Sequence, residues 1–252
     1  MTNIEADPSV IYAEGKMSLV ALVASMLKAV IFDLDGVLME FNLNSRTIKE
    51  EVIRFLEGKG LAAGIVKPED SFSAIKETFR SFFSERGKDS IWIDKLIREA
   101  EEIPVKHEIN AARVSKLLPQ AKETLVALRL MGLKLAVFTY NNRTATDIAL
   151  RRHKIEGLFD SVVCRDMVSQ PKPDSIHLSA VLKSLGAGAK EAVVVGDSEM
   201  DIKPSKELGV TVVAVTTGVR DAEYLKSLSP DYLIGNLYEI VGIVEKINGK
   251  RN

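Results

Sequence analysis

The sequence predicts an α/β protein with a doubly wound, Rossmann-like parallel sheet and an inserted α-helical domain. The first observation is that short apolar segments alternate with helical ones after Pro119, which is typical of βαβ units in a parallel sheet covered on both faces. The second is a buried-strand pattern at Ala29–Phe32, well before that alternation begins. The third is the stretch 44–108, which has helical spacing, no strand signal and more length than a bare loop in a compact domain.

These observations divide the chain into predicted parts. The tail is polar up to residue 16, and no signal-peptide cleavage site separates the apolar stretch Met17–Lys28 from the first strand. We interpret the tail as a loosely attached appendage, and the sequence leaves open whether residues 1–25 belong to the native protein. The predicted parts are an N-terminal extension (1–26), a Rossmann-like catalytic core (27–43 and 109–252) and a helical cap domain (44–108).

Composition argues against several classes of partner. The 34 Lys and Arg residues against 35 Asp and Glu residues give a formal net charge of -1, which does not favour binding to nucleic acid or to a membrane surface through bulk charge. Met17–Lys28 is too short to span a membrane. The single cysteine, Cys164, cannot form an internal disulfide, and its apolar surroundings indicate a core residue. We therefore expect a cytoplasmic protein without nucleic-acid or membrane partners; the oligomeric state is not predicted.

Helical spacing recurs three times in the predicted insertion. Asn44–Lys59 carries apolar residues at helical intervals and ends near two glycines, and Lys67–Arg86 repeats the pattern with Pro68 near its first turn. The third stretch, Ile91–Glu102, is expected to end before Pro104, because proline in a helix interior removes a hydrogen bond. The sequence therefore predicts three helices here.

The second part of the chain alternates regularly. A helix around Leu125 and Leu128 is expected to stop at Gly132. The predicted strands that follow are Lys134–Thr139, Ser161–Cys164, Ala192–Gly196, Val210–Val215 and Tyr232–Ile234. The predicted helices between and after them are Asn142–His153, Asp174–Leu185, Glu199–Leu208, Ala222–Leu228 and Leu237–Ile247. In such sheets, ligands bind outside the carboxyl ends of the strands.

Four strands lead into residues that can carry chemistry. The first ends in Asp33 and Asp35, within AVIFDLDG, although two carboxylates at the end of a buried strand are costly unless something pairs with them. The other residues are Thr139 in FTYNN, Lys172 in QPKPDS, and Asp197 with Asp201 in VVVGDSEMD. Taken singly, these are also explained as a strand-end cap, a solvated loop lysine and an acidic helix start. The three histidines have no metal-ligand spacing, and we expect them to be structural.

As a set, these motifs resemble the haloacid dehalogenase-like hydrolase superfamily, in the phosphoglycolate-phosphatase-like branch with a helical cap. The likeness covers residues 27 to the last helix and consists of DxDG, a strand ending in Thr, Lys-Pro and GDSxxD. It implies a phosphatase acting on a small phosphorylated metabolite, over which the cap would close. Val37 stands where many phosphoglycolate phosphatases have Thr, which leaves that particular substrate doubtful.

The resemblance also implies a role for each aspartate. Asp33 would be the nucleophile that forms an aspartyl-phosphate, and Asp35 the general acid and then base. Asp33, Asp197 and the backbone carbonyl of Asp35 would bind Mg²⁺, which prefers oxygen ligands. Asp201, one helical turn after Asp197, would orient Lys172 or the water shell of the metal.

The remaining motif residues would bind the phosphoryl group. By the same resemblance, Lys172 supplies a fixed positive charge. Thr139, with the backbone N–H of Tyr140 or Asn141, would hold phosphoryl oxygens. Which residues of the cap set specificity, and which phosphoester is the substrate, are not predicted.

Three other functions stay open on this fold. A dehalogenase would need neither Asp35 nor Mg²⁺, so the intact motifs disfavour it. A phosphoglucomutase-like phosphotransferase usually has a histidine in the cap hinge, where this chain has Ser45. A non-catalytic binding protein would typically have lost a motif residue, and none is lost.

Overall fold

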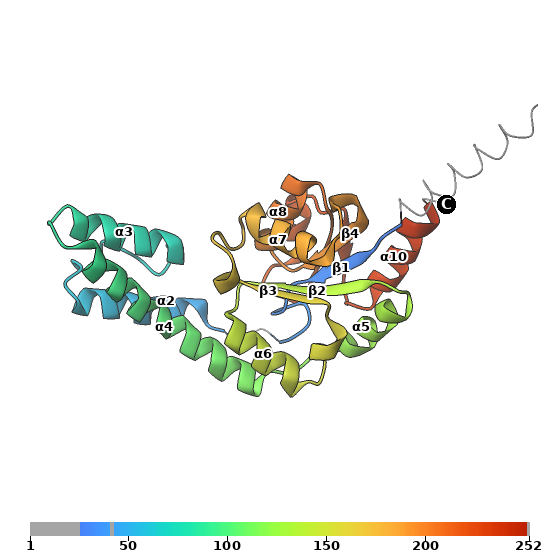
Figure 1. Ribbon diagram of the computed structural model, residues 1–252, viewed down its shortest axis with the longest axis horizontal. Coiled ribbons are helices and arrows are strands. Elements are labelled where there is room, and N and C mark those ends of the chain that lie inside the picture. Colours follow the sequence, from blue (N-terminus) through green and yellow to red (C-terminus); the bar gives the residue numbers. More distant parts are fainter. Residues whose placement is uncertain (1–25, 41–42, 251–252) are drawn as a thin grey trace, which may run out of the picture. The chain divides into compact units, whose positions relative to one another are not determined.

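The computed structural model describes residues 26–40 and 43–250 (Figure 1). The prediction for the tail, residues 1–25, lies outside them. The described residues pack into two compact units: the first holds 26–40, Leu117–Tyr140 and 155–250, and the second holds 43–116 and Asn141–Lys154. The second unit contains the stretch predicted as the cap and extends beyond it at 109–116 and 141–154. The domain boundaries themselves stay a prediction.

The first unit is built on one six-stranded sheet. All of its strand pairs are parallel, in the order β3-β2-β1-β4-β5-β6, so the chain winds outward in both directions from β1. This order is the doubly wound one, and it confirms the predicted fold class. The strands are β1 (Ala29–Phe32), β2 (Lys134–Thr139), β3 (Ser161–Cys164), β4 (Ala192–Gly196), β5 (Thr211–Val215) and β6 (Tyr232–Ile234).

The register of the central strands decides where the site forms. Phe32, the last residue of β1, pairs with Val137 of β2 on one side and with Val195 of β4 on the other. The segments that follow Phe32, Thr139 and Gly196 therefore leave the sheet at the same end of the strands. The gap between β1 and β4 is also where the winding reverses, which is the usual ligand position in this architecture.

Helices cover both faces of this sheet (Figure 1). Helices α7 and α8 pack on one face, over a core that contains Ile31, Phe138 and Val194, all fully buried. Helix α5 packs on β2 and contacts α10. The helices of this unit are α5 (Ala121–Leu130), α7 (Ser175–Leu185), α8 (Glu199–Leu208), α9 (Ala222–Ser227) and α10 (Glu239–Lys250), with 3₁₀ turns η1 (Glu156–Leu158), η2 (Arg165–Met167) and η3 (Ala189–Glu191).

The second unit is helical in its described part. Its helices are α2 (Ser45–Gly58), α3 (Phe72–Ser84), α4 (Ser90–Val114) and α6 (Arg143–Arg152). Each begins after a polar N-cap whose side chain accepts a backbone N–H three residues on; these caps are Asn44, Ser71, Asp89 and Asn142. Helices α2, α3 and α4 share an apolar core in which Phe79 and Phe83 stack with ring centroids 4.8 Å apart.

The prediction that the third helix ends before Pro104 is wrong. Helix α4 continues through Pro104 to Val114. A proline inside a helix costs about 3 kcal/mol, because it removes a backbone donor and crowds the preceding turn. Here α4 is held on both sides of the proline, with Ala100 buried before it and Ala112 after it. Packing against α2 and α6 overrides the local signal.

Within the described ranges, no helix combines the length and the apolar character needed to cross a membrane.

Candidate active site

The carboxyl end of β1 carries Asp33 into a tight turn. The backbone N–H of Asp33 still donates to the carbonyl of Val195 on β4, 2.9 Å away, so this residue is held by the sheet. Its side chain keeps 13% of its surface exposed, which leaves it accessible to a ligand. The chain then turns back at Gly36, whose N–H donates to the Met39 carbonyl and whose φ of +81° favours glycine. Asp35 lies in this turn, half-buried.

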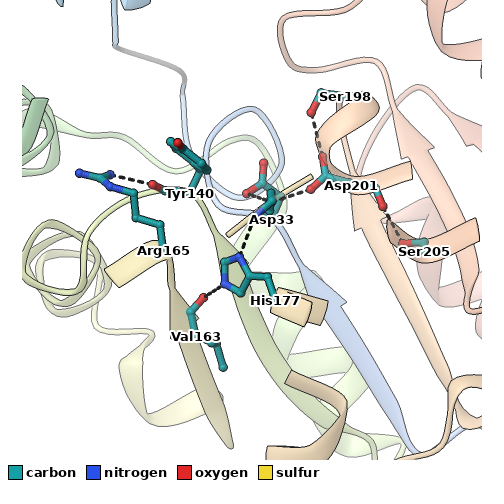
Figure 2. Close-up of polar contacts among 9 residues, drawn as sticks. Asp33, Tyr140, Val163, Arg165, His177, Ser198, Asp201 and Ser205 are labelled. Carbon is teal, nitrogen blue, oxygen red and sulfur yellow. Dashed lines mark hydrogen bonds and ion pairs between the residues drawn. The ribbon is translucent and has the colours of Figure 1, made fainter. Parts of the chain in front are cut away.

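Lys172 is the cation of the site. Its side chain is 1% exposed, and its Nζ lies 2.7 Å from Asp33 Oδ1 and 2.6 Å from Asp201 Oδ1. Asp33 and Asp201 lie close together at this edge of the sheet (Figure 2). The family resemblance implied that Asp201 orients Lys172 or the water shell of the metal, and this ion pair is the contact that the first of these roles requires.

The carboxyl end of β4 supplies the other two aspartates. Asp197 accepts the backbone N–H of Val219 at 2.9 Å through Oδ2. Asp201, on the first turn of α8, is fully buried and accepts the Ser198 hydroxyl at 3.0 Å through Oδ2. Its backbone carbonyl accepts the Ser205 hydroxyl at 2.6 Å (Figure 2). Both oxygens of the Asp201 carboxylate are therefore engaged by protein donors.

Glycines make the close packing around these carboxylates possible. A Cβ at Gly36 would lie 2.6 Å from Asp197 Oδ2. A Cβ at Gly218, in the loop after β5, would overlap the same carboxylate, and one at Gly196 would overlap the side chain of Asp201. The sequence offered no signal for Gly218, because the contact depends on the side chain that this residue lacks.

The cluster has more negative than positive charge. Carboxylate oxygens of Asp33, Asp197 and Asp201 lie within 4.8 Å of one another, against the one ammonium of Lys172. Burial, opposed by Lys172 and reinforced by Asp201 and Asp197, raises the pKa of Asp33 well above its usual value. Burial and then Asp201 raise the pKa of Asp197 to about 6. Burial alone would lower the pKa of Lys172, but Asp201 and Asp33 hold it above its usual value.

This charge excess and donor set fit a divalent cation with hard oxygen ligands. Asp33 and Asp197 have oxygens that can face an ion, whereas Asp201 is committed to Lys172 and Ser198. The Asp35 side chain is not part of the cluster, which is compatible with a ligand role for its backbone carbonyl only. The ligand set Asp33, Asp35 and Asp197 stays a prediction.

The predicted phosphate-binding residues follow β2. Thr139, the last residue of β2, is buried and belongs to the first unit with half-buried Tyr140, whereas Asn141 belongs to the second unit. The carbonyl of Tyr140 accepts Arg165 Nη1 at 2.7 Å, and the guanidinium lies 5.6 Å from the Tyr140 ring centroid (Figure 2). Arg165 is not among the residues predicted from the sequence motifs, although its place directly after β3 was a usable signal.

The fold and the site define a class of protein: a doubly wound α/β enzyme with a carboxylate–lysine cluster at the point where the winding reverses. The haloacid dehalogenase-like hydrolase family matches residues 30–215, and the chain belongs to this family. This membership confirms the resemblance inferred from the motifs.

Named relatives cover nearly the whole chain. A pyrophosphatase PpaX of Oceanobacillus iheyensis is 26% identical over 86% of this chain and 97% of its own length. A glyceraldehyde 3-phosphate phosphatase of Methanocaldococcus jannaschii is 29% identical over 88% of this chain and 99% of its own. The solved structure of a putative β-phosphoglucomutase from Thermotoga maritima is 25% identical, with a TM-score of 0.56 over 87% of this chain and 99% of its own. Family and relatives confirm the predicted enzyme class, a phosphatase-type hydrolase of this superfamily.

Proposed function

We propose that the protein is a Mg²⁺-dependent phosphatase that hydrolyses a small phosphorylated metabolite through an aspartyl-phosphate on Asp33. The observation that carries the proposal is the position of Asp33. The backbone of Asp33 is held by the sheet, its side chain is 13% exposed, and its Oδ1 lies 2.7 Å from the buried ammonium of Lys172. A nucleophile for phosphorus needs such a fixed and accessible oxygen, with positive charge beside it for the phosphoryl group.

The two aspartates of the turn divide the chemistry between them. Asp33 attacks phosphorus, and the bond from phosphorus to the leaving oxygen breaks. Asp35 gives its proton to that oxygen and then takes one from the water that hydrolyses the aspartyl-phosphate. Asp35 is two residues beyond Asp33 in a turn closed by the Gly36–Met39 hydrogen bond, which supports a shared reaction centre for both carboxyl groups.

Asp33, Asp197 and the backbone carbonyl of Asp35 would hold the Mg²⁺. When bound, this ion supplies positive charge that offsets both the carboxylate cluster and the phosphoryl oxygens. The supporting observation is the uncompensated charge of the three clustered carboxylates around Lys172.

Lys172, Thr139 and the backbone N–H of Tyr140 or Asn141 would bind the phosphoryl oxygens. Asp201 keeps the ammonium of Lys172 in place through its ion pair of 2.6 Å. Because Lys172 is held by its ion pairs within the first unit before substrate arrives, its charge needs no reorganisation during the reaction.

The substrate class rests on the named relatives. They are a pyrophosphatase and a phosphatase of glyceraldehyde 3-phosphate, both of which imply a small phosphorylated compound. A second candidate is a phosphoglucomutase-like phosphotransferase, favoured by the similarity to the putative β-phosphoglucomutase. Ser45 in place of a hinge histidine makes this the weaker candidate.

The test is phosphate release from a panel that includes pyrophosphate, glyceraldehyde 3-phosphate, phosphoglycolate and a generic phosphate ester. Each compound is assayed with Mg²⁺ and with a chelator, and Asp33→Asn serves as the blank. We expect release from at least one compound that depends on both Mg²⁺ and Asp33. No release above the blank from any compound would contradict the proposal. Isomerisation of a sugar phosphate that requires a bisphosphate primer would favour the phosphotransferase instead.

A further inference from the structure

We propose that His177 is a positioning residue for Lys172: its neutral imidazole fixes the backbone of the lysine and thereby the ammonium beside Asp33. The consequence for turnover rests on the function proposed above, whereas the contact itself does not. Neither the spacing of the histidines nor the motif set predicts this role.

The imidazole connects two segments. His177 lies on α7 and is fully buried. Its Nδ1 lies 3.2 Å from the backbone nitrogen of Lys172. Its Nε2 lies 3.1 Å from the carbonyl oxygen of Val163 on β3 (Figure 2). One ring thus joins the edge of the sheet to the residue that carries the catalytic ammonium.

These partners determine the protonation state. The backbone nitrogen of Lys172 is a donor, so Nδ1 must present its lone pair; the Val163 carbonyl is an acceptor, so Nε2 must carry the hydrogen. Only the neutral tautomer with hydrogen on Nε2 satisfies both contacts. Burial, opposed by the Val163 hydrogen bond and aided by the charge of Lys172, lowers the pKa of His177 to about 4, in agreement with a neutral ring at pH 7.

Phe138 supports the same arrangement from β2. The His177 ring meets the Phe138 ring edge to face, with centroids 4.6 Å apart. The Nζ of Lys172 lies 4.3 Å from the centroid of that same ring. The ammonium is therefore surrounded by Phe138, Asp33 and Asp201, while His177 holds the main chain from which the side chain extends.

A purely apolar residue could not replace these contacts. Strand β3 is at an edge of the described sheet and pairs only with β2, and the Val163 carbonyl is bound from outside the sheet by the His177 ring. Without the imidazole, this carbonyl and the Lys172 N–H would both be buried without these partners, which is unfavourable. The backbone at Lys172 would then shift to find other partners, and small displacements at a reacting centre lower rates strongly.

The experiment compares three variants at a temperature well below the melting point of each. His177→Phe keeps an aromatic ring but removes both hydrogen bonds. His177→Asn retains an acceptor close to the position of Nδ1. Leu178→Ala, at the fully buried neighbour on α7, is the matched control, because it destabilises the same helix and removes no polar side-chain atom that could bond to Lys172.

Two readouts separate positioning from a general structural role. The first is the ¹H–¹⁵N correlation of the Lys172 ammonium in protein carrying ¹⁵N-lysine, assigned by its loss in Lys172→Arg. The second is kcat/KM on the best phosphoester of the panel. We expect His177→Phe to shift or broaden the ammonium signal and to lower kcat/KM about 10- to 100-fold. Leu178→Ala should keep the signal and stay within about twofold of the wild type, and His177→Asn should recover most of the loss.

The proposal is overturned if His177→Phe matches Leu178→Ala in both readouts. It is also overturned if the ¹⁵N shifts of His177 at pH 7 place the hydrogen on Nδ1. Failure of the proposed function looks different: the wild type would hydrolyse no phosphoester, while the ammonium signal would still report whether His177 positions Lys172.

Discussion

The buried ion pairs of the first unit contrast with the exposed ion pairs of the second unit. In the first unit, Asp33, Lys172 and Asp201 are largely or fully buried, and two carboxylates share one ammonium. In the second unit, charged side chains pair on the surface, as in Arg80–Asp94 at 2.7 Å and Lys76–Glu101 at 2.6 Å, with all four side chains more than 40% exposed. The nitrogen–oxygen distances of these ion pairs are the same in both units, and only the solvent exposure of the side chains differs.

This difference indicates where the chemistry is. Exposed ion pairs contribute about 0–1 kcal/mol, because solvent screens them and holding two long side chains costs entropy. Buried charges lose hydration and are retained where the function requires them. One buried carboxylate of the second unit follows a third pattern: Glu108 accepts the backbone N–H of Asn142 at 2.9 Å, and so stabilises the start of α6.

The largest effect is expected from Asp33→Asn, which keeps the shape of the side chain but removes the nucleophile. Turnover of the best substrate should fall by at least about 10⁴-fold, while the fold is retained. Asp201→Asn should lower it only about 10- to 100-fold, because Lys172 keeps Asp33 as a partner. Phosphate release and melting temperature measure both. Activity of Asp33→Asn within tenfold of the wild type would contradict the proposed role of Asp33 as the nucleophile.

The next effect concerns pH and His177. The pKa of His177 in the folded protein, about 4, is below its ordinary value of 6.5. Between pH 6.5 and pH 4 the imidazole is therefore protonated in the unfolded chain and neutral in the folded one. The contribution of His177 to stability is therefore complete above about pH 6.5 and declines by up to about 3 kcal/mol as the pH falls to 4. Asp33 and Asp197 have the opposite effect on the pH dependence of stability: because their pKa values are raised in the folded protein, protonating them as the pH falls favours the folded state.

Denaturant unfolding of the wild type and of His177→Phe between pH 7 and pH 4 isolates the contribution of His177 to the pH dependence of stability. The stability difference between the two proteins should narrow as the pH falls. A constant difference would show that the imidazole is not a buried neutral group.

A smaller effect is expected from Mg²⁺ on the stability of the first unit. Binding to Asp33 and Asp197 should stabilise the folded chain by about 2.7 kcal/mol when the ion is present at 100 times its Kd. Because the pKa of Asp197 is raised to about 6, protons should compete with the ion below that pH. Thermal unfolding with and without MgCl₂ measures the shift. An equal shift in Asp197→Asn would place the ion elsewhere.

The smallest effect belongs to the second unit. Arg80→Ala removes an exposed partner of Asp94 and should change the free energy of unfolding by less than about 1 kcal/mol. A double-mutant cycle with Asp94→Ala, followed by denaturant unfolding, gives the coupling energy of the pair. A coupling energy above about 2 kcal/mol would contradict the expectation that exposed ion pairs contribute little to stability.

Local patterns were enough to predict the sheet. Strand bounds such as Lys134–Thr139 and Ala192–Gly196 were predicted to the residue, because apolar runs between turn signals leave few alternatives. The end of α4 could not be predicted, because the packing that carries the helix past Pro104 comes from segments distant in sequence. Helix spacing and capping describe the chain locally and contain no information on such partners.

The site could be predicted only as a set of side chains. The motifs identified Asp33, Lys172 and Asp201, but the contacts among them depend on the strand order that brings β4 beside β1. The contact between the Val219 N–H and Asp197 involves a backbone group, so residue type gives no sign of it. For His177, the sequence predicted a structural histidine and gave no information on its partners.

The hydrogen bond from the Asp33 backbone to Val195 has a consequence for the durability of the site. It extends the ladder between the two innermost strands, the part of a sheet that is usually last to open in local fluctuations. The Asp33 amide should therefore exchange with solvent deuterium only through global unfolding. Asp33, the proposed nucleophile, should thus be attached to one of the most slowly exchanging segments of the first unit, and its geometry should last as long as that unit remains folded.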